Sequence, residues 1–310
     1  MELEIIDSIS RLVSQSSKGD VHPVGIGDDA AIVRIRNQTV LMASDMLLDG
    51  VHFNVKSTPP YLIGRKALAV NLSDIAAMAG TPVACTVSLA IQRGLSSYWI
   101  LEVMKGIKDL ADQFEVAVVG GDTNYWDGPF SLNVSIVGNE HPKGSVLRSG
   151  ASADDRIFVT GPLGGSISGK QFTFTPRVKE AQWLRDHFDI TSMIDISDGL
   201  STDLRHILKS SGVGAKLFRD RIPRNQTSTL NEASGLHDRQ PRLCTIDEAL
   251  TDGEDFELCF TLRPDDAVKI FDFAPRHQVQ IFEIGSVTSS VASLMFDDGT
   301  AIESRGYQHR

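Results

Sequence analysis

One segment of the chain, "YLIGRKALAVNLSDIAAMAG" (residues 61–80), restricts the possible folds most strongly. Pro59-Pro60 marks the start of a helix, and the residues that follow are apolar on nearly every helical face. A helix that is hydrophobic all round has to be buried, so other elements must cover it. Asp74 interrupts this helix, and an unpaired carboxylate is costly to bury. A metal ion or a buried Arg or Lys would provide the cation that Asp74 needs.

Strands and helices alternate along the rest of the chain, which predicts an α/β or α+β fold. The first half contains predicted helices at 3–13, 60–80 and 97–114 and predicted strands at 30–36, 39–45, 83–91, 116–120 and 130–138. The second half contains predicted strands at 156–160, 191–197, 213–218, 256–260 and 278–287, and predicted helices at 177–188, at 199–210 and from Pro264. Residues 220–242 are polar and are predicted to be an irregular surface segment. A Gly-, Ser-, Pro- and Asp-rich stretch after Val137 indicates a passage between two domains, 1–140 and 141–310.

Acidic residues recur where predicted strands begin or end, most of them near glycines. They are Asp28, Asp29, Asp45, Asp122, Asp195, Asp198, Glu254 and Asp255. Open α/β sheets place ligand groups at strand ends, although an Asp there is also a common turn former or helix N-cap. Asp198 could cap the helix that follows it, and Asp28 could close an Asx turn. Their recurrence favours metal and phosphate binding, and scattered carboxylates suit Mg²⁺, which keeps several waters.

The overall charge restricts the partners. The 310 residues carry a formal charge of -10, which disfavours nucleic-acid binding, and phosphate ligands would require bound cations. The first residues lack the pattern of a signal peptide, and no apolar stretch is predicted to cross a membrane. Three widely spaced cysteines argue against a disulfide or zinc framework. We therefore expect a cytoplasmic protein.

The stretch "GPLGGSISGKQ" (residues 161–171) nearly matches a phosphate-binding P-loop. A P-loop requires Ser or Thr after its Lys, because that hydroxyl ligates Mg²⁺. Gln171 occupies this position after Lys170, so we expect a glycine-rich turn without a phosphate site. A genuine P-loop would make Lys170 essential for nucleotide binding.

Nine short motifs occur in one order along the chain: "GIGDDAA", "SDMLLDGVHF", "KALAVNLSDIAAMAG", "VVGGDT", "LRSGA", "VTGPLGGS", "IDISDGL", "SGVGAKL" and "GEDFELCF". In this order the chain resembles the thiamine-monophosphate kinases from about Gly25 to its C-terminus. The resemblance implies a two-domain aminoimidazole-ribonucleotide-synthetase-like fold. Its N-terminal domain would form a dimeric β-barrel-like sheet, and its C-terminal α/β domain would complete the active site. It also implies an ATP cleft at a homodimer interface and Mg²⁺-dependent transfer of the ATP γ-phosphoryl group to thiamine monophosphate.

The resemblance assigns roles to individual residues. It places Asp29, Ser44, Asp45, Asp74, Asp122, Asp195 and Asp198 at metal positions. It places Gly121, Asp122, Arg148 and Ser197 at nucleotide positions, and His52, Glu254 and Ser304 on the substrate side. The acceptor is a phosphate monoester that is largely dianionic near pH 7, so no general base is expected.

Some positions depart from the family pattern. Ala43 replaces a hydroxyl residue, and Asp252 replaces the first Gly of "GGED". Ser304 and Arg310 stand where aromatic residues are usual, and an aromatic before Gly306 would stack on the substrate ring. Two alternatives follow: an enzyme of this superfamily acting on another phosphorylated metabolite, and a nucleotide-binding regulator without activity.

Overall fold

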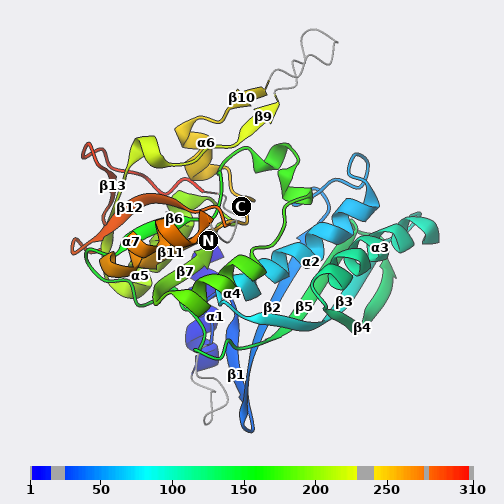
Figure 1. Cartoon of the computed structure of the whole chain (residues 1–310). Helices are drawn as coiled ribbons and strands as arrows, with labels where there is room; N and C mark the ends of the chain where they lie inside the picture. The colour runs from blue at the N-terminus through cyan, green and yellow to red at the C-terminus, as the bar shows by residue number, and fades with distance from the viewer. Residues whose placement is uncertain (1, 15–24, 229–240, 276–278, 307–310) are drawn as a thin grey trace. The chain divides into compact units, whose positions relative to one another are not determined.

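The computed structural model of the chain describes residues 2–14, 25–228, 241–275 and 279–306 (Figure 1). The chain folds into two compact units. The first comprises Met1–Ser145 and Phe172–Gln182, and the second comprises Val146–Gln171 and Trp183–Arg310.

The first unit is built on one sheet of five strands. Its elements are α1 (Glu2–Ser14), β1 (Ala31–Ile35), β2 (Gln38–Leu48), α2 (Pro60–Ala77), β3 (Thr81–Gln92), α3 (Ser97–Gln113), β4 (Ala117–Trp126) and β5 (Ser131–Asn139). The strand order is β1-β2-β5-β3-β4, with β3 and β4 parallel and the other neighbours antiparallel. Among the described strands, β1 and β4 each pair on one side only. The sheet is therefore open, and the barrel-like detail of the predicted fold is not confirmed.

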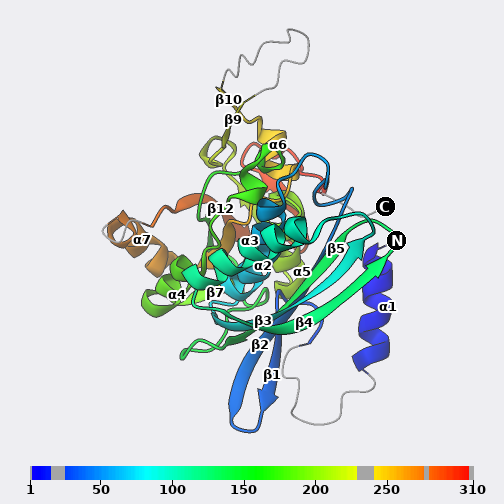
Figure 2. The same ribbon diagram turned by 90° about the vertical axis from the view of Figure 1, so that its right-hand side faces the viewer.

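Helices α2 and α3 lie against one face of this sheet (Figure 2). Pro60 occupies the first turn of α2, and the helix is buried along most of its length, as its apolar sequence predicts. On the other face β3 and β5 carry polar side chains that alternate with buried ones, among them Thr86, Ser88, Asn133 and Ser135.

Two strands extend beyond their predicted ends, and this changes the setting of two acidic residues. Asp45 was expected to end its strand, but β2 continues to Leu48 because β5 pairs with it through Ser131. Asp122 was expected to follow a strand that ends at Gly120, but β4 continues to Trp126 alongside β3. The Gly-Gly-Asp sequence resembles a turn, yet ladder pairing keeps the backbone extended.

The second unit holds a sheet of six strands. Its elements begin with β6 (Arg156–Val159), η1 (Ser166–Ser168), β7 (Ile190–Asp195), α5 (Leu200–Ser211), β8 (Gly214–Leu217), η3 (Arg219–Arg221), β9 (Gln226–Ser228) and β10 (Pro241–Leu243). They continue with α6 (Ile246–Thr251), β11 (Leu258–Leu262), α7 (Pro264–Phe273), β12 (Phe282–Thr288) and β13 (Leu294–Phe296). The order is β13-β8-β12-β6-β11-β7, and β9 pairs separately with β10. The short η2 (Lys170–Phe172) and α4 (Val178–His187) each continue across the boundary between the units.

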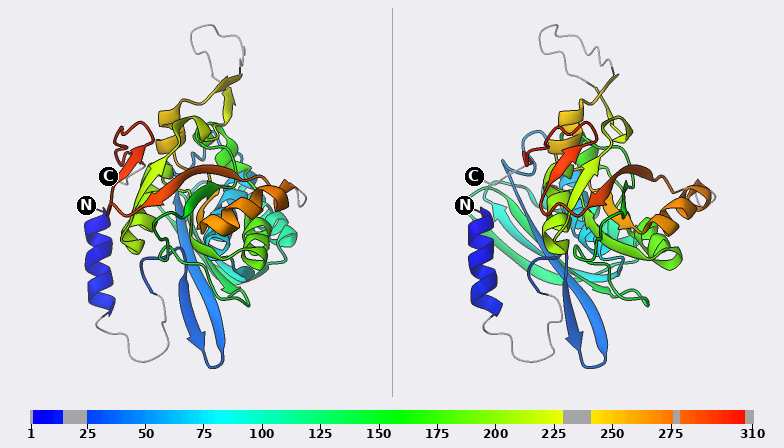
Figure 3. Two further views of the ribbon diagram at one scale, coloured as in Figure 1. Left: turned by 60° about the vertical axis from the view of Figure 1, so that its left-hand side comes forward. Right: turned by 90° about the vertical axis from the view of Figure 1, so that its left-hand side faces the viewer.

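Helices cover both faces of the six-stranded sheet (Figure 3). On one face, α5 contributes Leu204 and Leu208 to a core that contains Ile157 and Val159 of β6. Phe158 of the same strand points to the other face, where its ring contacts Phe260 and Phe271, the latter from α7. The period of two along β6 thus separates the two cores.

The prediction that residues 220–242 form an irregular surface segment is partly wrong. The range overlaps η3 and β10 and includes β9, while residues 229–240 lie outside the described residues. The sequence pattern also missed α6 and β13, because both are short. No helix in the described ranges is long and apolar enough to cross a membrane.

Candidate metal and phosphate site

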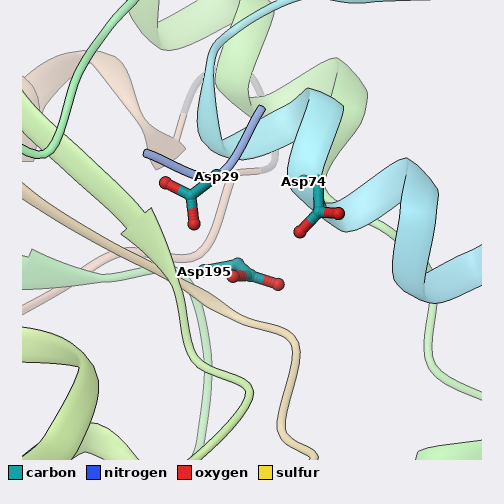
Figure 4. A group of neighbouring side chains, drawn as sticks. All are labelled: Asp29, Asp74 and Asp195. Carbon is teal, nitrogen blue, oxygen red and sulfur yellow. The ribbon is translucent and has the colours of Figure 1, made fainter. Parts of the chain in front are cut away.

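Two carboxylates of the first unit lie close together. Asp29 follows the loop Gly25–Asp28, and Asp74 lies near the end of the buried helix α2 (Figure 4). Their carboxylate oxygens approach within 4.8 Å. Two negative charges at this distance repel each other, so the arrangement favours a cation between them. Asp28 accepts a hydrogen bond from the backbone N–H of Asp29 at 3.2 Å, which orders this loop.

Asp45 is tied to the same helix through Asn71. The backbone N–H of Asp45 donates to Asn71 Oδ1 at 3.2 Å, and the amide of Asn71 donates to the carbonyl of Ala67 at 3.0 Å. Asn71 precedes Asp74 by three residues, so both lie on neighbouring positions of one helical face. The helix therefore holds the Asp45 region of β2 next to the turn that carries Asp74.

Ser44 belongs to a polar network on the exposed face of the sheet. Its hydroxyl lies 2.9 Å from that of Ser135, and the amide of Asn133 donates to Ser44 Oγ at 3.0 Å. The same amide donates to the carbonyl of Asp45, also at 3.0 Å. Since neighbouring residues of a strand face opposite sides, Ser44 and Asp45 present their side chains to different faces.

Gly121 and Asp122 lie in the edge strand β4. A Cβ atom at Gly121 would lie 1.7 Å from the carbonyl oxygen of Val87 on β3, so only glycine fits this pairing. Asp122 is exposed and accepts hydrogen bonds from the backbone of Thr123 at 2.8 Å and from the amide of Asn124 at 2.7 Å. β5 and β3 separate β4 from β2, a spacing of about 14 Å at about 4.8 Å per strand. One sheet therefore does not bring Asp122 beside Asp45.

His52 lies in the turn after β2, and its ring orientation is fixed. The backbone N–H of Leu48 donates to His52 Nδ1 at 3.0 Å, which leaves the proton of the neutral ring on Nε2. The ammonium group of Lys66 donates to the carbonyl of His52 at 3.0 Å and also lies over the ring of Phe172. Lys66 is fully buried, so these contacts replace its lost hydration.

In the second unit, the predicted residues gather before α5. Asp195 is the last residue of β7 and is buried (Figure 4), and Ser197 and Asp198 follow it. The N-cap of α5 is Gly199, and the carboxylate of Asp203 accepts hydrogen bonds from the backbone of Asp198 and Gly199 at 3.0 Å. The capping role considered for Asp198 therefore falls to Asp203.

Glu254 and Ser304 lie near this helix start. The backbone N–H of Glu254 donates to the carbonyl of Ser197 at 2.7 Å. The hydroxyl of Ser304 lies 3.3 Å from that of Thr202, in the first turn of α5, and Gly306 packs against the carbonyl of Asp198. Two of the three predicted substrate-side positions, Glu254 and Ser304, thus lie beside the acidic turn within the second unit. Arg310 lies outside the described residues.

Arg148 lies at the opposite end of α5. Its carbonyl accepts a hydrogen bond from Ser211 Oγ at 3.3 Å, and Ser211 is the last residue of the helix. The helix has 12 residues, about 18 Å, so the backbone of Arg148 is well separated from Ser197. The backbones of these two predicted nucleotide residues therefore lie near opposite ends of α5.

The glycine-rich stretch 161–171 is not built as a phosphate loop. The backbone N–H groups of Gly164 and Gly165 donate to the carboxylates of Asp255 and Asp252, at 2.9 and 2.8 Å. Lys170 donates to Glu257 at 3.0 Å, and only a 3₁₀ turn follows the glycines. Protein carboxylates therefore occupy the donors that a phosphate would need, and burial raises the pKa values of both Asp252 and Asp255.

Sequence reasoning missed the residues that support this site. Asn71 and Lys66 bind the backbone of Asp45 and His52, while Asn133 bridges Ser44 and Asp45. A signal for each was present. Asn71 and Lys66 are polar residues on an apolar helix, and Asn133 is a polar residue that alternates with apolar ones along a strand.

Comparison with known proteins shows the family of the chain. Residues 27–139 match the family model of the AIR synthase related protein N-terminal domain, and residues 169–295 match that of its C-terminal domain. The thiamine-monophosphate kinase of Rhodopirellula baltica is 38% identical over 259 residues, covering 80% of this chain and 78% of the relative. The enzyme of that name from Escherichia coli strain K12 is 33% identical, covering 95% of this chain and 94% of the relative.

A solved structure has the same fold. The structure of AaThiL complexed with AMPPCP and TMP matches with a TM-score of 0.80 and 27% identity. The match covers 100% of this chain and 97% of that one. The two-domain architecture expected from the sequence is therefore confirmed.

Proposed function

Because the chain belongs to the thiamine-monophosphate kinase family of AIR synthase related proteins, we propose that it transfers the γ-phosphoryl group of ATP to thiamine monophosphate. The products are thiamine diphosphate and ADP. The observation that carries the proposal is the pairing of Asp29 with Asp74, in a chain that resembles these kinases over nearly its whole length.

The proposed cofactor is Mg²⁺. The donor set fits this ion, because it consists of carboxylate and hydroxyl oxygens and includes no thiol. Several ions are proposed, and the residues that would hold them between them are Asp29, Ser44, Asp45, Asp74, Asp122, Asp195 and Asp198. When bound, divalent ions neutralise charge on both phosphate groups and on the leaving ADP.

The side chains would then orient ATP and thiamine monophosphate, two polyanions, for in-line transfer. His52 can donate its Nε2 proton to the acceptor phosphate, because Nδ1 already accepts from the backbone of Leu48. Arg148 offers a planar guanidinium that matches the oxygens of ATP. The acceptor is mostly dianionic near pH 7, so no residue of the chain needs to remove a proton.

We propose that the remaining predicted residues divide between the two ligands. Gly121, Asp122, Arg148 and Ser197 would contact the nucleotide, and His52, Glu254 and Ser304 would contact thiamine monophosphate. The separation of Asp122 from Asp45 supports more than one metal ion, and that of the backbones of Arg148 and Ser197 supports an extended nucleotide site.

The chain is proposed to act as a homodimer in the cytoplasm. Along the edge strand β4, exposed apolar side chains flank the predicted nucleotide residues: Val118, Val119, Tyr125 and Trp126. Such an edge is suited to pair with a second copy of the chain. The three cysteines, all within the described residues, are buried free thiols, and free thiols are typical of a reducing compartment.

Ser304 favours a second candidate, a different phosphorylated acceptor. Because this residue is a serine, position 304 supplies no aromatic ring for thiamine. Its side chain is exposed, and its hydroxyl lies 3.3 Å from that of Thr202. A substrate panel of thiamine monophosphate, thiamine and aminoimidazole precursors separates the two candidates.

The direct experiment is a turnover assay with ATP, Mg²⁺ and thiamine monophosphate that measures thiamine diphosphate. We expect product from the wild type, and loss of product when EDTA removes divalent ions. Replacing one metal carboxylate, in Asp74→Asn, should lower turnover at least about 100-fold with little change in melting temperature.

Asp112→Asn is the matched control, because Asp112 is an exposed helical aspartate paired with Lys108. It should retain wild-type turnover. Product from the aminoimidazole precursor alone would favour the second candidate. ATP binding without any product would indicate a regulator, and full activity of Asp74→Asn would contradict metal placement by this residue.

A further inference from the structure

We propose that the glycine-rich loop 161–170 is a clasp that positions the turn carrying Glu254, with Ser166 and Lys170 as positioning residues. The inference rests on the proposed function in one respect, the assignment of Glu254 to the substrate. The contacts themselves lie within the second unit.

The turn at Glu254 is strained. Gly253, Glu254 and Phe256 have φ angles of 68°, 58° and 49°. A side chain in the left-handed region costs about 1–2 kcal/mol, so two such residues within three positions require support from their surroundings. Strain of this kind persists where a side chain must be held in a particular place.

One side of the turn is held by backbone hydrogen bonds. The N–H groups of Glu254 and Phe256 donate to the carbonyls of Ser197 and Ile196, at 2.7 and 2.8 Å. Ile196 donates in return to the carbonyl of Glu257 at 2.8 Å. These bonds fix the turn to the segment between β7 and α5.

The other side is held by the glycine-rich loop. Asp255 is 1% exposed, and its carboxylate accepts from the backbone of Gly164 at 3.1 and 2.9 Å and from the hydroxyl of Ser166. Gly165 donates to Asp252 at 2.8 Å. The loop thus binds two carboxylates of the turn, one on each side of Glu254.

Lys170, at the end of the loop, makes a further contact with the turn. Its ammonium group donates to Glu257 at 3.0 Å and to the carbonyl of Pro162 at 3.2 Å. Glu257 is also 1% exposed, and its second oxygen accepts from Thr160 Oγ1 at 2.9 Å. A buried carboxylate with two donors is fixed in position, so the loop holds residues 252–257 on the side opposite Ile196 and Ser197.

The test compares Ser166→Ala with Ser168→Ala. Both serines lie in η1, but Ser166 is fully buried against Asp255 and Ser168 is exposed. Ser166→Ala should raise the KM for thiamine monophosphate by up to about tenfold, because loss of a hydrogen bond to a charged group lowers the fraction of molecules in which the turn is correctly placed. The KM for ATP should change less than about twofold, and Ser168→Ala should match the wild type.

Lys170 provides a second pair of variants. Lys170→Met should raise the same KM, and Lys170→Arg should restore it, because a guanidinium can still pair with Glu257. Amide hydrogen exchange over residues 253–257 should be faster in Ser166→Ala and Lys170→Met than in wild type.

The two readouts separate this inference from the proposed function. A wild type that forms no thiamine diphosphate contradicts the proposed function. In that case the amide exchange rates at residues 253–257 alone test whether the loop positions the turn. Unchanged exchange at 253–257 in Ser166→Ala overturns the inference. A proportional rise of both KM values, or a loss of ATP binding in Lys170→Met, also overturns it.

Discussion

At the scale of single residues, the carboxyl group of Asp255 makes the clasp sensitive to pH. Burial raises its pKa from 3.8 to about 6, against the opposing effects of Ser166, Gly164 and Lys170. Nearby Glu257 raises it further. A pKa that is higher in the folded state means that folding favours the protonated form. This contribution to stability is therefore complete below pH 3.8 and is lost as the pH rises through about 6.

We expect Asp255→Asn to remove this dependence. At about 1.4 kcal/mol per pKa unit, the wild type should lose on the order of 3 kcal/mol relative to the variant between pH 4 and pH 7. Urea denaturation of both proteins across this range, in buffer without divalent ions, measures the difference. Parallel pH profiles would contradict the assignment.

Single residues also show how much of the site the sequence can predict. Asp74 could be predicted because a carboxylate on an apolar helix needs a cation, and Asp29 does lie close to it. The supporting role of Asn133 could not, because it depends on the register between β2 and β5. The roles of all the predicted site residues remain predictions.

At the scale of elements, α2 was predictable and β4 was not. The apolar sequence of α2 predicts a buried helix, and in the structure α2 packs against both the sheet and α3. The extension of β4 past Gly121 depends on its partner β3, since local sequence there suggests a turn. The short elements α6 and β13 carry too few residues for a clear period.

The contact between α2 and α3 yields a prediction about stability. A Cβ atom at Gly106 of α3 would lie 1.9 Å from the carbonyl oxygen of Tyr61 on α2, and one at Gly64 would lie 1.8 Å from that of Val103. The two helices therefore meet backbone to backbone.

Gly106→Ala should lower the free energy of unfolding by about 1–3 kcal/mol or more, because the helices have to separate. Intrinsic helix propensity alone predicts the opposite sign, a gain of about 1 kcal/mol. Chemical denaturation decides between them. Lys105→Ala, an exposed neighbour on the same helix, is the control and should stay close to the wild type. A stabilised Gly106→Ala would show that the helices do not meet at this point.

At the scale of the whole molecule, the alternation of strands and helices predicted the fold class, and the two family domains confirm it. The predicted boundary at residues 140 and 141 remains a prediction. In the structure the segment Phe172–Gln182 belongs with the first unit, which a linear division of the sequence does not anticipate. Arg65 holds this segment through the carbonyls of Phe172 and Phe174, at 3.1 and 2.6 Å.

The proposed homodimer is testable at the edge strand β4, which pairs only with β3 among the described strands. Val119 is 65% exposed there, next to the predicted nucleotide residues Gly121 and Asp122. If a second chain covers this strand, Val119→Asp places an unpaired charge in an apolar interface and should shift the protein from dimer to monomer. Turnover should fall in parallel, since the nucleotide site would lose its partner. Light scattering coupled to size exclusion measures the mass. Val268→Asp on α7, where the native valine is 74% exposed, should remain dimeric and active. A wild-type protein with the mass of one chain would rule out this interface.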